Sequence, residues 1–433
     1  MKKKNLIFIG VEVFILVGIL ICYSIILSPH LRAKIDNMFR DNNKMKYRIA
    51  SDDEHISGNV QSIKADITVE GSKVNVVQDI LLKNPQSEIY CYIPAANSAK
   101  PVIKKVQTKS GFKSFHSDTA NLIITCDEPQ NSIQLDYEFA LSNNAKPLSY
   151  TEDFILLTNF LITPALYKNG VPILSYKWDF GDPYIYDISN YEVTVTTDKD
   201  LHIYAPGKRS EKIQEEYKTA VFRADGIRDF PVVIAKSAQV TSVAIANTTI
   251  HYIDSIEARE AVENAFRFAS EKIGAYPYPE FFVVKAPISQ NGMEFSNMIF
   301  ISDYCFKNRA TLKRVTYHEV FHQWFYGVIG TDQFNEPFFD EGLVNYLALR
   351  LNGIQINDSY NNSLFHLKLN DYQSLQQYYD LVYSDSASYF YSLHKKLGDD
   401  FYTMLQRIYA DKKFTVFYFE DFLKYVNEYL GGR

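Results

Sequence analysis

The strongest constraint on the fold is the run H-E-V-F-H at residues 318–322, followed after eighteen intervening residues by Glu341. Residues four apart on a helix project from the same face, so a helix through this run presents His318 and His322 on one side. Glu319 lies one step around the turn. A chain that uses Glu341 together with both histidines must pack a second helix against the first.

These side chains match the needs of a catalytic zinc ion. Such an ion commonly takes two His and one Glu as ligands and keeps a fourth position open for water. His318, His322 and Glu341 supply that set, and Glu319 stands where a general base can take a proton from water and pass it to a leaving amine. The spacing therefore predicts one zinc ion and a hydrolytic reaction.

An apolar stripe on the same helix favours burial of the two histidines. Tyr317, Phe321, Trp324 and Val328 follow helical spacing beside the histidine row. A lone buried histidine is usually a hydrogen-bonded core residue, whereas two at this spacing with a glutamate between them favour a pair of metal ligands.

Composition indicates a globular chain with more than one domain. The chain has 433 residues, more than one ordinary core accommodates, and 46% of them are apolar. The formal net charge of −6 is spread without a long block of either sign. We therefore expect no nucleic-acid partner.

The first thirty residues differ from the rest. Lysines at 2–4 precede an almost unbroken apolar run from Leu6 to Leu27, which is long enough to span a bilayer and longer than the apolar part of a cleavable signal peptide. We predict a transmembrane anchor with a short cytoplasmic tail at residues 1–30 and a polar stalk at 31–58. The protein would then be a single-pass protein of the cell membrane, with an extracellular catalytic domain.

The next region is rich in β-strand patterns. Residues 59–240 contain short runs of β-branched and aromatic residues broken by turn residues, and predict an all-β domain, either a saddle or a sandwich. Residues 172–186 are expected to form a loop, to which no function is assigned. Cys91 and Cys126 are open to two interpretations, a disulfide or two buried free thiols.

The pattern changes near residue 241. Residues 241–433 are expected to be mostly helical with a small sheet, starting with an amphipathic helix at 255–273. Thr311 is the expected N-cap of the histidine helix, and residues 338–351 are the expected partner helix that carries Glu341.

The motifs resemble those of the gluzincin zinc aminopeptidases of the aminopeptidase N family, whose pattern is H-E-x-x-H, eighteen residues, then Glu in an N/D-E-G run. Residues 335–343, N-E-P-F-F-D-E-G-L, are similar to that second run. The family also has an upstream G-x-M-E-N motif, which contacts the substrate backbone and binds its free α-amine through the Glu. Gly292, Met293 and Glu294 resemble this motif, with Phe295 in place of the Asn. A carboxylate there would pair with an ammonium group and fix the scissile bond one residue away.

The resemblance also implies an oxyanion donor. The family uses a Tyr about fifteen residues before the Gly of an L-G pair, and Tyr383 stands fifteen residues before Gly398. A phenolic hydroxyl is a sound donor to a tetrahedral oxyanion, although the Y-S-D-S context lacks the family's Lys and Gly, and a packing tyrosine is the alternative. Asn345, one turn after Glu341, is a hypothetical partner for a ligand histidine.

Taken as a whole, the resemblance implies an α+β multi-domain fold. A transmembrane helix and an all-β saddle or sandwich would precede a thermolysin-like, mostly helical catalytic domain with a small sheet. The implied function is that of a short, membrane-anchored bacterial-type zinc metallopeptidase, an aminopeptidase that hydrolyses the N-terminal bond of a peptide. The family's large C-terminal domains are absent, so a more open cleft is expected. An endopeptidase with the same zinc chemistry and a catalytically retired peptide-binding membrane protein stay as alternatives.

Overall fold

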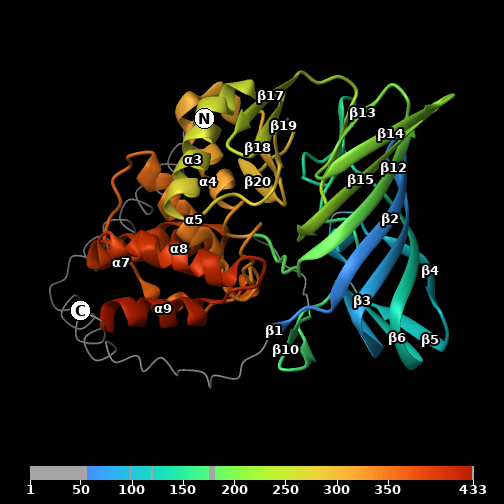
Figure 1. Ribbon diagram of the computed structural model, residues 1–433, viewed down its shortest axis with the longest axis horizontal. Helices are drawn as coiled ribbons and strands as arrows, with labels where there is room; N and C mark the ends of the chain where they lie inside the picture. Colours follow the sequence, from blue (N-terminus) through green and yellow to red (C-terminus); the bar gives the residue numbers. More distant parts are fainter. Residues whose placement is uncertain (1–55, 98, 119, 175–180, 432–433) are drawn as a thin grey trace, which may run out of the picture. The chain divides into compact units, whose positions relative to one another are not determined.

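A nine-stranded sheet dominates the N-terminal part of the chain (Figure 1). The computed structural model describes residues 56–431, except 98, 119 and 175–180. Side chains alternate between buried and exposed along the strands, as in β12 (Ser189–Asp198), so one face of the sheet is apolar. The order across the sheet is β14 (Lys208–Gln214), β15 (Tyr217–Ile227), β12, β2 (Val60–Glu70), β3 (Lys73–Tyr92), β6 (Asn121–Ala140) and β4 (Val102–Thr108), with β5 (Phe112–Ser117) paired to β6 and β9 (Thr163–Pro164) paired to β3. All of these pairs are antiparallel except β12 with β2, which is parallel.

Two smaller sheets complete the β part. Ile155, Ile203 and Ile234 of the four-stranded sheet belong to the same buried core as the apolar face of the large sheet, so the two sheets form a sandwich. Its order is β13 (His202–Tyr204), β16 (Val232–Ala235), β8 (Phe154–Leu157) and β7 (Ser149–Tyr150). The three-stranded sheet contains β1 (Ile56–Ser57), β10 (Tyr167–Lys168) and β11 (Val171–Pro172).

A five-stranded sheet begins the second part of the chain. Its order is β17 (Val240–Ile245), β18 (Thr248–Ile253), β19 (Glu280–Ala286), β21 (Met298–Ser302) and β20 (Gly292–Phe295), which leaves β20 at an edge. The pairs β18–β19 and β19–β21 are parallel, and the other two are antiparallel. The helix α3 (Arg259–Lys272) packs on this sheet, with the Phe266 ring 6.1 Å from that of Phe281. Strands β19 and β21 thus belong to a small sheet in the region where one was expected.

Helices make up most of the remaining chain (Figure 1). They are α4 (Arg309–Phe321), α5 (Pro337–Leu351), α6 (Leu375–Tyr378), the π-helix η6 (Tyr379–Asp385), α7 (Ser386–Leu397), α8 (Asp400–Lys412) and α9 (Phe419–Gly431), with short 3₁₀ turns η1 (Pro94–Asn97), η2 (Ile256–Ala258), η3 (Cys305–Lys307), η4 (Asn362–Leu364) and η5 (Leu369–Asp371). Helix α5 is buried on nearly all sides, because Phe338, Phe339, Leu343 and Leu347 pack in several directions.

Arg228 ties the β part to the second part of the chain. Its side chain is 1% exposed, and its guanidinium donates to the carbonyl oxygens of Tyr186, Tyr326, Val328 and Thr415 over 2.6–3.1 Å. A buried guanidinium is tolerated only when its donors are satisfied, so these four carbonyls hold Arg228 and the segments that carry them together.

The predicted mixed fold is confirmed, but the predicted localisation is not. Among the residues that the structure describes, no helix is long and apolar enough to cross a membrane. This finding contradicts a single-pass membrane protein with an extracellular catalytic domain, so that prediction is wrong. The apolar run at 6–27, the anchor at 1–30 and nearly all of the stalk at 31–58 lie outside the described residues. The division into domains at 59–240 and 241–433 stays a prediction.

The structure also answers two smaller questions, the state of Cys91 and Cys126 and the N-cap of α4. Cys91 and Cys126 are buried free thiols, so the disulfide interpretation is wrong. The N-cap of α4 is Asn308, whose side-chain oxygen accepts from the Thr311 backbone N–H at 3.0 Å, and not Thr311 itself. Sequence spacing suggested Thr311 because it is a good capping residue, but the helix begins one turn earlier, where Asn308 is equally suited.

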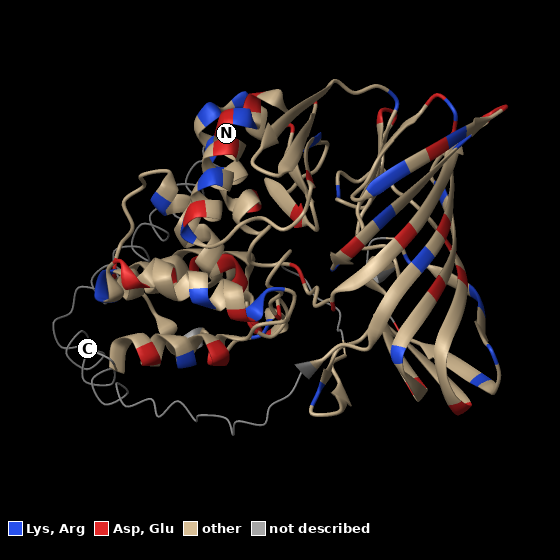
Figure 2. Cartoon of the chain, viewed as in Figure 1, with Lys and Arg blue, Asp and Glu red and all other residues tan. Residues whose placement is uncertain are grey.

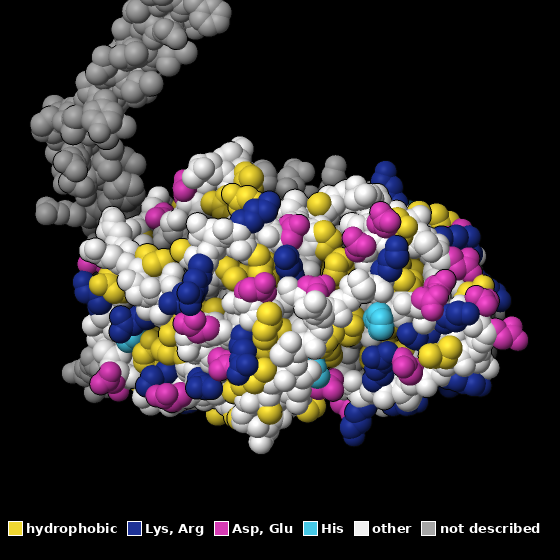
Figure 3. All heavy atoms as spheres, turned by 90° about the horizontal axis from the view of Figure 1, so that it is seen from above, with side chains coloured by type: hydrophobic (Ala, Val, Ile, Leu, Met, Phe, Trp, Pro, Cys, Tyr) yellow, Lys and Arg dark blue, Asp and Glu magenta, His cyan; other side chains and the backbone are white. Residues whose placement is uncertain are grey.

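Charges of both signs alternate over the surface. Figure 2 shows Lys and Arg interspersed with Asp and Glu along β14 and β2. On the face seen in Figure 3, hydrophobic side chains occur in small groups separated by charged and polar ones. Neither view shows a broad face of one kind.

Candidate metal and peptide site

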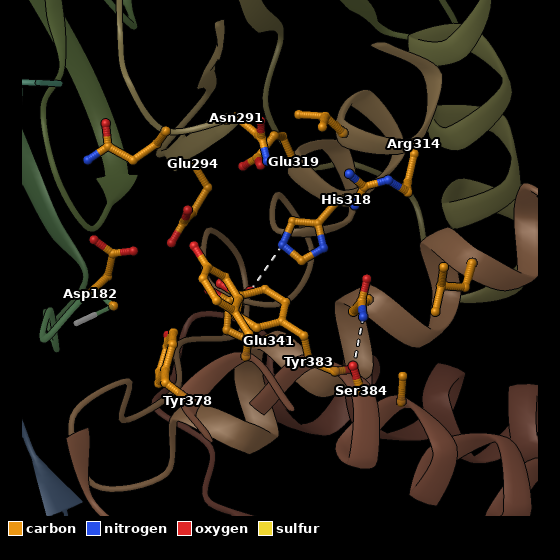
Figure 4. A pocket seen from close by; sticks show the side chains of 18 of the residues that line it. Asp182, Asn291, Glu294, Arg314, His318, Glu319, Glu341, Tyr378, Tyr383 and Ser384 are labelled. Carbon is orange, nitrogen blue, oxygen red and sulfur yellow. Dashed lines mark hydrogen bonds and ion pairs between the residues drawn. The ribbon is translucent and has the colours of Figure 1, made fainter. Parts of the chain in front are cut away.

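Helices α4 and α5 bring the three predicted metal ligands together. Nε2 of His318 lies 3.0 Å from Oε2 of Glu341 (Figure 4) and 3.1 Å from Nε2 of His322. The third separation, His322 Nε2 to Glu341 Oε2, is 3.4 Å. The three atoms thus form a compact triangle that could hold a metal ion. Two elements that the sequence joins through eighteen residues meet at this point, as the spacing predicted.

The triangle has the dimensions of a zinc site. Ligand atoms about 2.0–2.1 Å from a tetrahedral zinc ion lie roughly 3.3–3.4 Å apart, close to the separations of the three atoms here. The other ring nitrogen of His322, Nδ1, lies 3.2 Å from the Phe325 carbonyl oxygen. A carbonyl only accepts, so Nδ1 carries the hydrogen and Nε2 keeps its lone pair for a metal. The residues therefore fit zinc.

Glu319 lies beside the triangle with one oxygen unused. Its side chain is 5% exposed, and Oε2 has no hydrogen-bond partner among the described residues. Gly292 makes room for it, because a Cβ at that position would overlap the Glu319 carboxyl. A buried carboxylate with a free oxygen is able to exchange a proton with a water molecule or a substrate.

Strand β20 positions Glu294 on the same cavity. Its side chain is 4% exposed and accepts a hydrogen bond at Oε1 from Nε2 of Gln333 at 2.9 Å. The same nitrogen donates to Oδ2 of Asp340 at 2.7 Å, so Gln333 links the carboxylate on β20 to the residue that precedes Glu341. Sequence reasoning missed Gln333 because it lies between the two motifs and belongs to neither.

Tyr383 lies next to the metal ligands, on the π-helix. Its ring centre is 5.8 Å from that of His318, and Figure 4 shows it beside Glu341. Burial and the Glu341 carboxylate raise the pKa of Tyr383 well above its usual value, so the phenol keeps its proton. A π-helix is uncommon and often lies at a functional site.

Asn345 does not contact a ligand histidine through its amide nitrogen. Nδ2 donates to the backbone carbonyl of Tyr383 at 2.8 Å, so Asn345 fixes the π-helix and not a ligand ring. The hypothesis drawn from helical spacing was wrong because η6 packs against this face of α5.

Asp182 is a second residue that sequence reasoning missed. It lies in the region predicted to be a loop without function, and it lines the cavity on the same side of His318 as Glu294 (Figure 4). Burial and the Glu341 carboxylate raise its pKa to about 7. The only local signal is the turn-forming sequence Gly181-Asp182-Pro183, which carries no information on a distant site.

The carboxyl groups around the triangle make the site favourable to cations. Burial raises the pKa of Glu319 to about 8, although His322 opposes this shift, and burial raises the pKa of Glu294 well above its usual value. Burial would also raise the pKa of Glu341, but the two ligand histidines hold it well below the usual range. Cations bound nearby would stabilise the ionised carboxylates and relieve the cost of burying them together.

These residues surround a cavity of about 610 Å³. Gly292, Met293, Glu294, His318, Glu319, Glu341 and Tyr383 all contribute to its wall, whereas His322 lies behind it and is fully buried. The volume is large enough for a small molecule or a short peptide.

Solved structures of peptidases share this fold. An M1 zinc metallopeptidase from Deinococcus radiodurans has a TM-score of 0.63 at 15% identity, covering 86% of this chain and 91% of that chain. The chain has the fold of the M1 zinc metallopeptidases. A glutamate-to-alanine mutant from the same organism, bound to the substrate Tyr-Ser-Ala, has a TM-score of 0.64 at 16% identity, with coverage of 86% and 91%.

A two-domain M1 zinc metallopeptidase mutant bound to L-tryptophan has a TM-score of 0.62 at 16% identity, and the coverage is again 86% of this chain and 91% of that chain. No protein-family model and no curated protein matches the sequence. The predicted metallopeptidase is therefore confirmed at the level of the fold, whereas the particular resemblance to aminopeptidase N stays a prediction.

Proposed function

We propose that this chain is a zinc metallopeptidase that acts as an aminopeptidase. One observation carries the proposal: three potential ligand atoms lie 3.0–3.4 Å apart beside a cavity that two further carboxylates line. These are Glu319, which has an oxygen without a partner among the described residues, and Glu294, which accepts a hydrogen bond from Gln333. Structures with the same fold that hold a tripeptide substrate or an amino acid support a peptide with a free N-terminus as the substrate.

His318, His322 and Glu341 would hold one zinc ion. A zinc ion there would supply Lewis acidity toward the scissile carbonyl. The carbonyl of Phe325 fixes the orientation of the His322 ring, and the Asp340 carboxylate, 3.8 Å from Nδ1, adds a favourable charge to the donating N–H.

Glu319 would act as the general base and then the general acid. Its free Oε2 accepts a proton from the attacking water and returns it to the amine that leaves. Burial raises the pKa of Glu319 to about 8 without a metal, and a bound cation would lower it and favour the ionised form that a general base requires.

Glu294 would bind the α-ammonium group of the substrate. An ionised carboxylate in a buried position gives a strong charge-assisted hydrogen bond and fixes which peptide bond reaches the ligand triangle. Strand β20 is at the edge of its sheet, so the backbone of Gly292 and Met293 is available to pair with an extended substrate.

Tyr383 would donate a hydrogen bond to the developing oxyanion. The raised pKa keeps its hydroxyl protonated, which such a donor requires. Asn345 holds the backbone of Tyr383 against α5, which limits movement of the ring relative to the ligands.

The test compares peptides with a free and an N-acetylated N-terminus. The wild-type protein should hydrolyse the free peptide and scarcely the acetylated one, and Glu294→Gln should raise KM for the free peptide about 10- to 100-fold, the usual range for a hydrogen bond to a charged group. Equal hydrolysis of both peptides by the wild type would remove Glu294 from this role and favour the endopeptidase alternative.

A further inference from the structure

Arg314 lies in the cavity but has no partner in the proposed reaction. It is on α4, four residues before His318, and therefore on the same face of the helix one turn away. Its side chain is half-buried and contributes to the cavity wall. Figure 4 shows Arg314 on the other side of His318 from Glu294 and Asp182.

Arg314 carries a positive charge in a cavity whose other charged side chains are acidic. Four carboxylates line the cavity, those of Asp182, Glu294, Glu319 and Glu341, whereas Arg314 is the only Lys or Arg among the described residues that line it. No hydrogen bond or ion pair joins the Arg314 guanidinium to another described residue. A half-buried guanidinium without a carboxylate partner, in a cavity rich in carboxylates, leaves five donors available to a ligand.

Arg314 also opposes the metal site. A positive charge one helical turn from His318 repels a metal dication. A neutral side chain at this position would suit zinc better. A cationic side chain there is therefore better explained by an anionic group on the substrate than by a role in holding the metal.

We propose that Arg314 binds the C-terminal carboxylate of a di- or tripeptide substrate. The inference rests on the proposed aminopeptidase function and adds the substrate class. Four residues of helix rise about 6 Å, and one extended peptide residue spans about 3.3–3.6 Å. With the N-terminus at Glu294 and the scissile bond at the ligand triangle, the carboxylate of the second or third residue falls within reach of the long Arg314 side chain.

The arrangement gives the two ends of a short peptide opposite partners. Glu294 faces the ammonium group and Arg314 faces the carboxylate, on the two sides of His318. A planar guanidinium binds a carboxylate through two parallel hydrogen bonds, which adds direction as well as affinity. Peptides longer by several residues carry their carboxylate past Arg314 and gain nothing from it.

Binding to the zinc-loaded full-length Glu319→Gln variant tests the proposal without turnover. The probes are trialanine and its C-terminal amide, measured by calorimetry, with hexaalanine and its amide as the length control. Trialanine should bind about 10- to 100-fold more tightly than its amide, the range expected for a hydrogen bond to a charged group. The hexapeptide and its amide should bind alike.

Substitutions of Arg314 test whether this residue causes the preference for trialanine over its amide. In the same background, Arg314→Gln should abolish the difference between trialanine and its amide while leaving the affinity for the amide unchanged, and Arg314→Lys should keep part of the difference. Equal binding of acid and amide before the substitution, or an equal loss of both after it, would overturn the proposal. Because binding is measured in the Glu319→Gln variant, absence of hydrolysis by the wild type would sink the proposed function separately.

Discussion

At the residue scale, the site depends on side chains that belong to no motif. Gln333 donates both hydrogens of one nitrogen, one to Glu294 and the other to Asp340, and so holds two buried carboxylates at a fixed separation. Its own Oε1 is buried without a partner among the described residues, a cost that the two donated bonds offset. We infer that Gln333 positions Glu294 for the substrate ammonium.

Gln333→Met should impair substrate binding more than turnover. Methionine has a similar volume but donates nothing, so Glu294 loses a donor and its orientation. We expect KM for a free tripeptide to rise about tenfold with a smaller change in kcat, as steady-state kinetics would reveal. Gln78→Met is the matched control, because Gln78 is also buried and hydrogen-bonded but lies in the large sheet on β3, and it should cost stability without raising KM. The same KM in wild type and Gln333→Met would rule out the positioning role.

At the element scale, two helices and one edge strand carry the site. Helix α4 presents His318 and Glu319, α5 presents Glu341, and β20 presents Glu294. The orientation of α4 depends on where it begins, and Asn308 sets that point by accepting the Thr311 backbone N–H. The start of this helix therefore matters for function as well as for stability.

Asn308→Ala should destabilise the protein by about 1 kcal/mol, the usual cost of losing a capping side chain. Thr311→Ala is the contrasting variant, since its side chain does not cap the helix, and it should change the free energy of unfolding by less than about 0.5 kcal/mol. Urea denaturation of the two variants measures both values. A larger loss in Thr311→Ala than in Asn308→Ala would contradict the observed N-cap.

Local sequence patterns predicted the helices that carry the motifs. They did not predict features that depend on contacts between segments far apart in the sequence. The partner helix was expected at 338–351 and is found at Pro337–Leu351, because its apolar residues and its Pro at the start are local signals. The π-helix that carries Tyr383 has no such signal, since its packing against α5 fixes the backbone. Asp182 and Gln333 were missed for the same reason: only the folded chain brings them to Glu294 and Asp340.

At the scale of the whole molecule, the residues after β15 join the sandwich to the metal site. Arg228 holds Tyr326 and Val328 just beyond His322, and Asp229 accepts the Ser296 backbone N–H at 2.7 Å, directly after β20. These hydrogen bonds connect the β part to the segments that directly follow His322 and Glu294.

Asp229 should make stability depend on pH. Burial raises the pKa of Asp229 from its usual 3.8 to about 6. Its contribution is therefore fully present below pH 3.8 and is lost as the pH rises through 6, because the folded state then holds an ionised buried carboxylate. Relative to Asp229→Asn, the free energy of unfolding of the wild type should fall by about 2.4 kcal/mol between pH 4 and 7. Denaturation curves for the two proteins at several pH values test this, and a difference that stays constant with pH would contradict it.

The central claim is that His318, His322 and Glu341 hold a zinc ion and that Glu319 moves the proton. Zinc content and peptide hydrolysis, measured together on the wild type and on Glu319→Gln, test it most directly. Both proteins should contain one zinc ion per chain, because the three ligands are untouched, and hydrolysis by Glu319→Gln should fall about 10²- to 10⁴-fold. A wild type that binds no zinc, or a Glu319→Gln variant that retains full activity, would contradict the account.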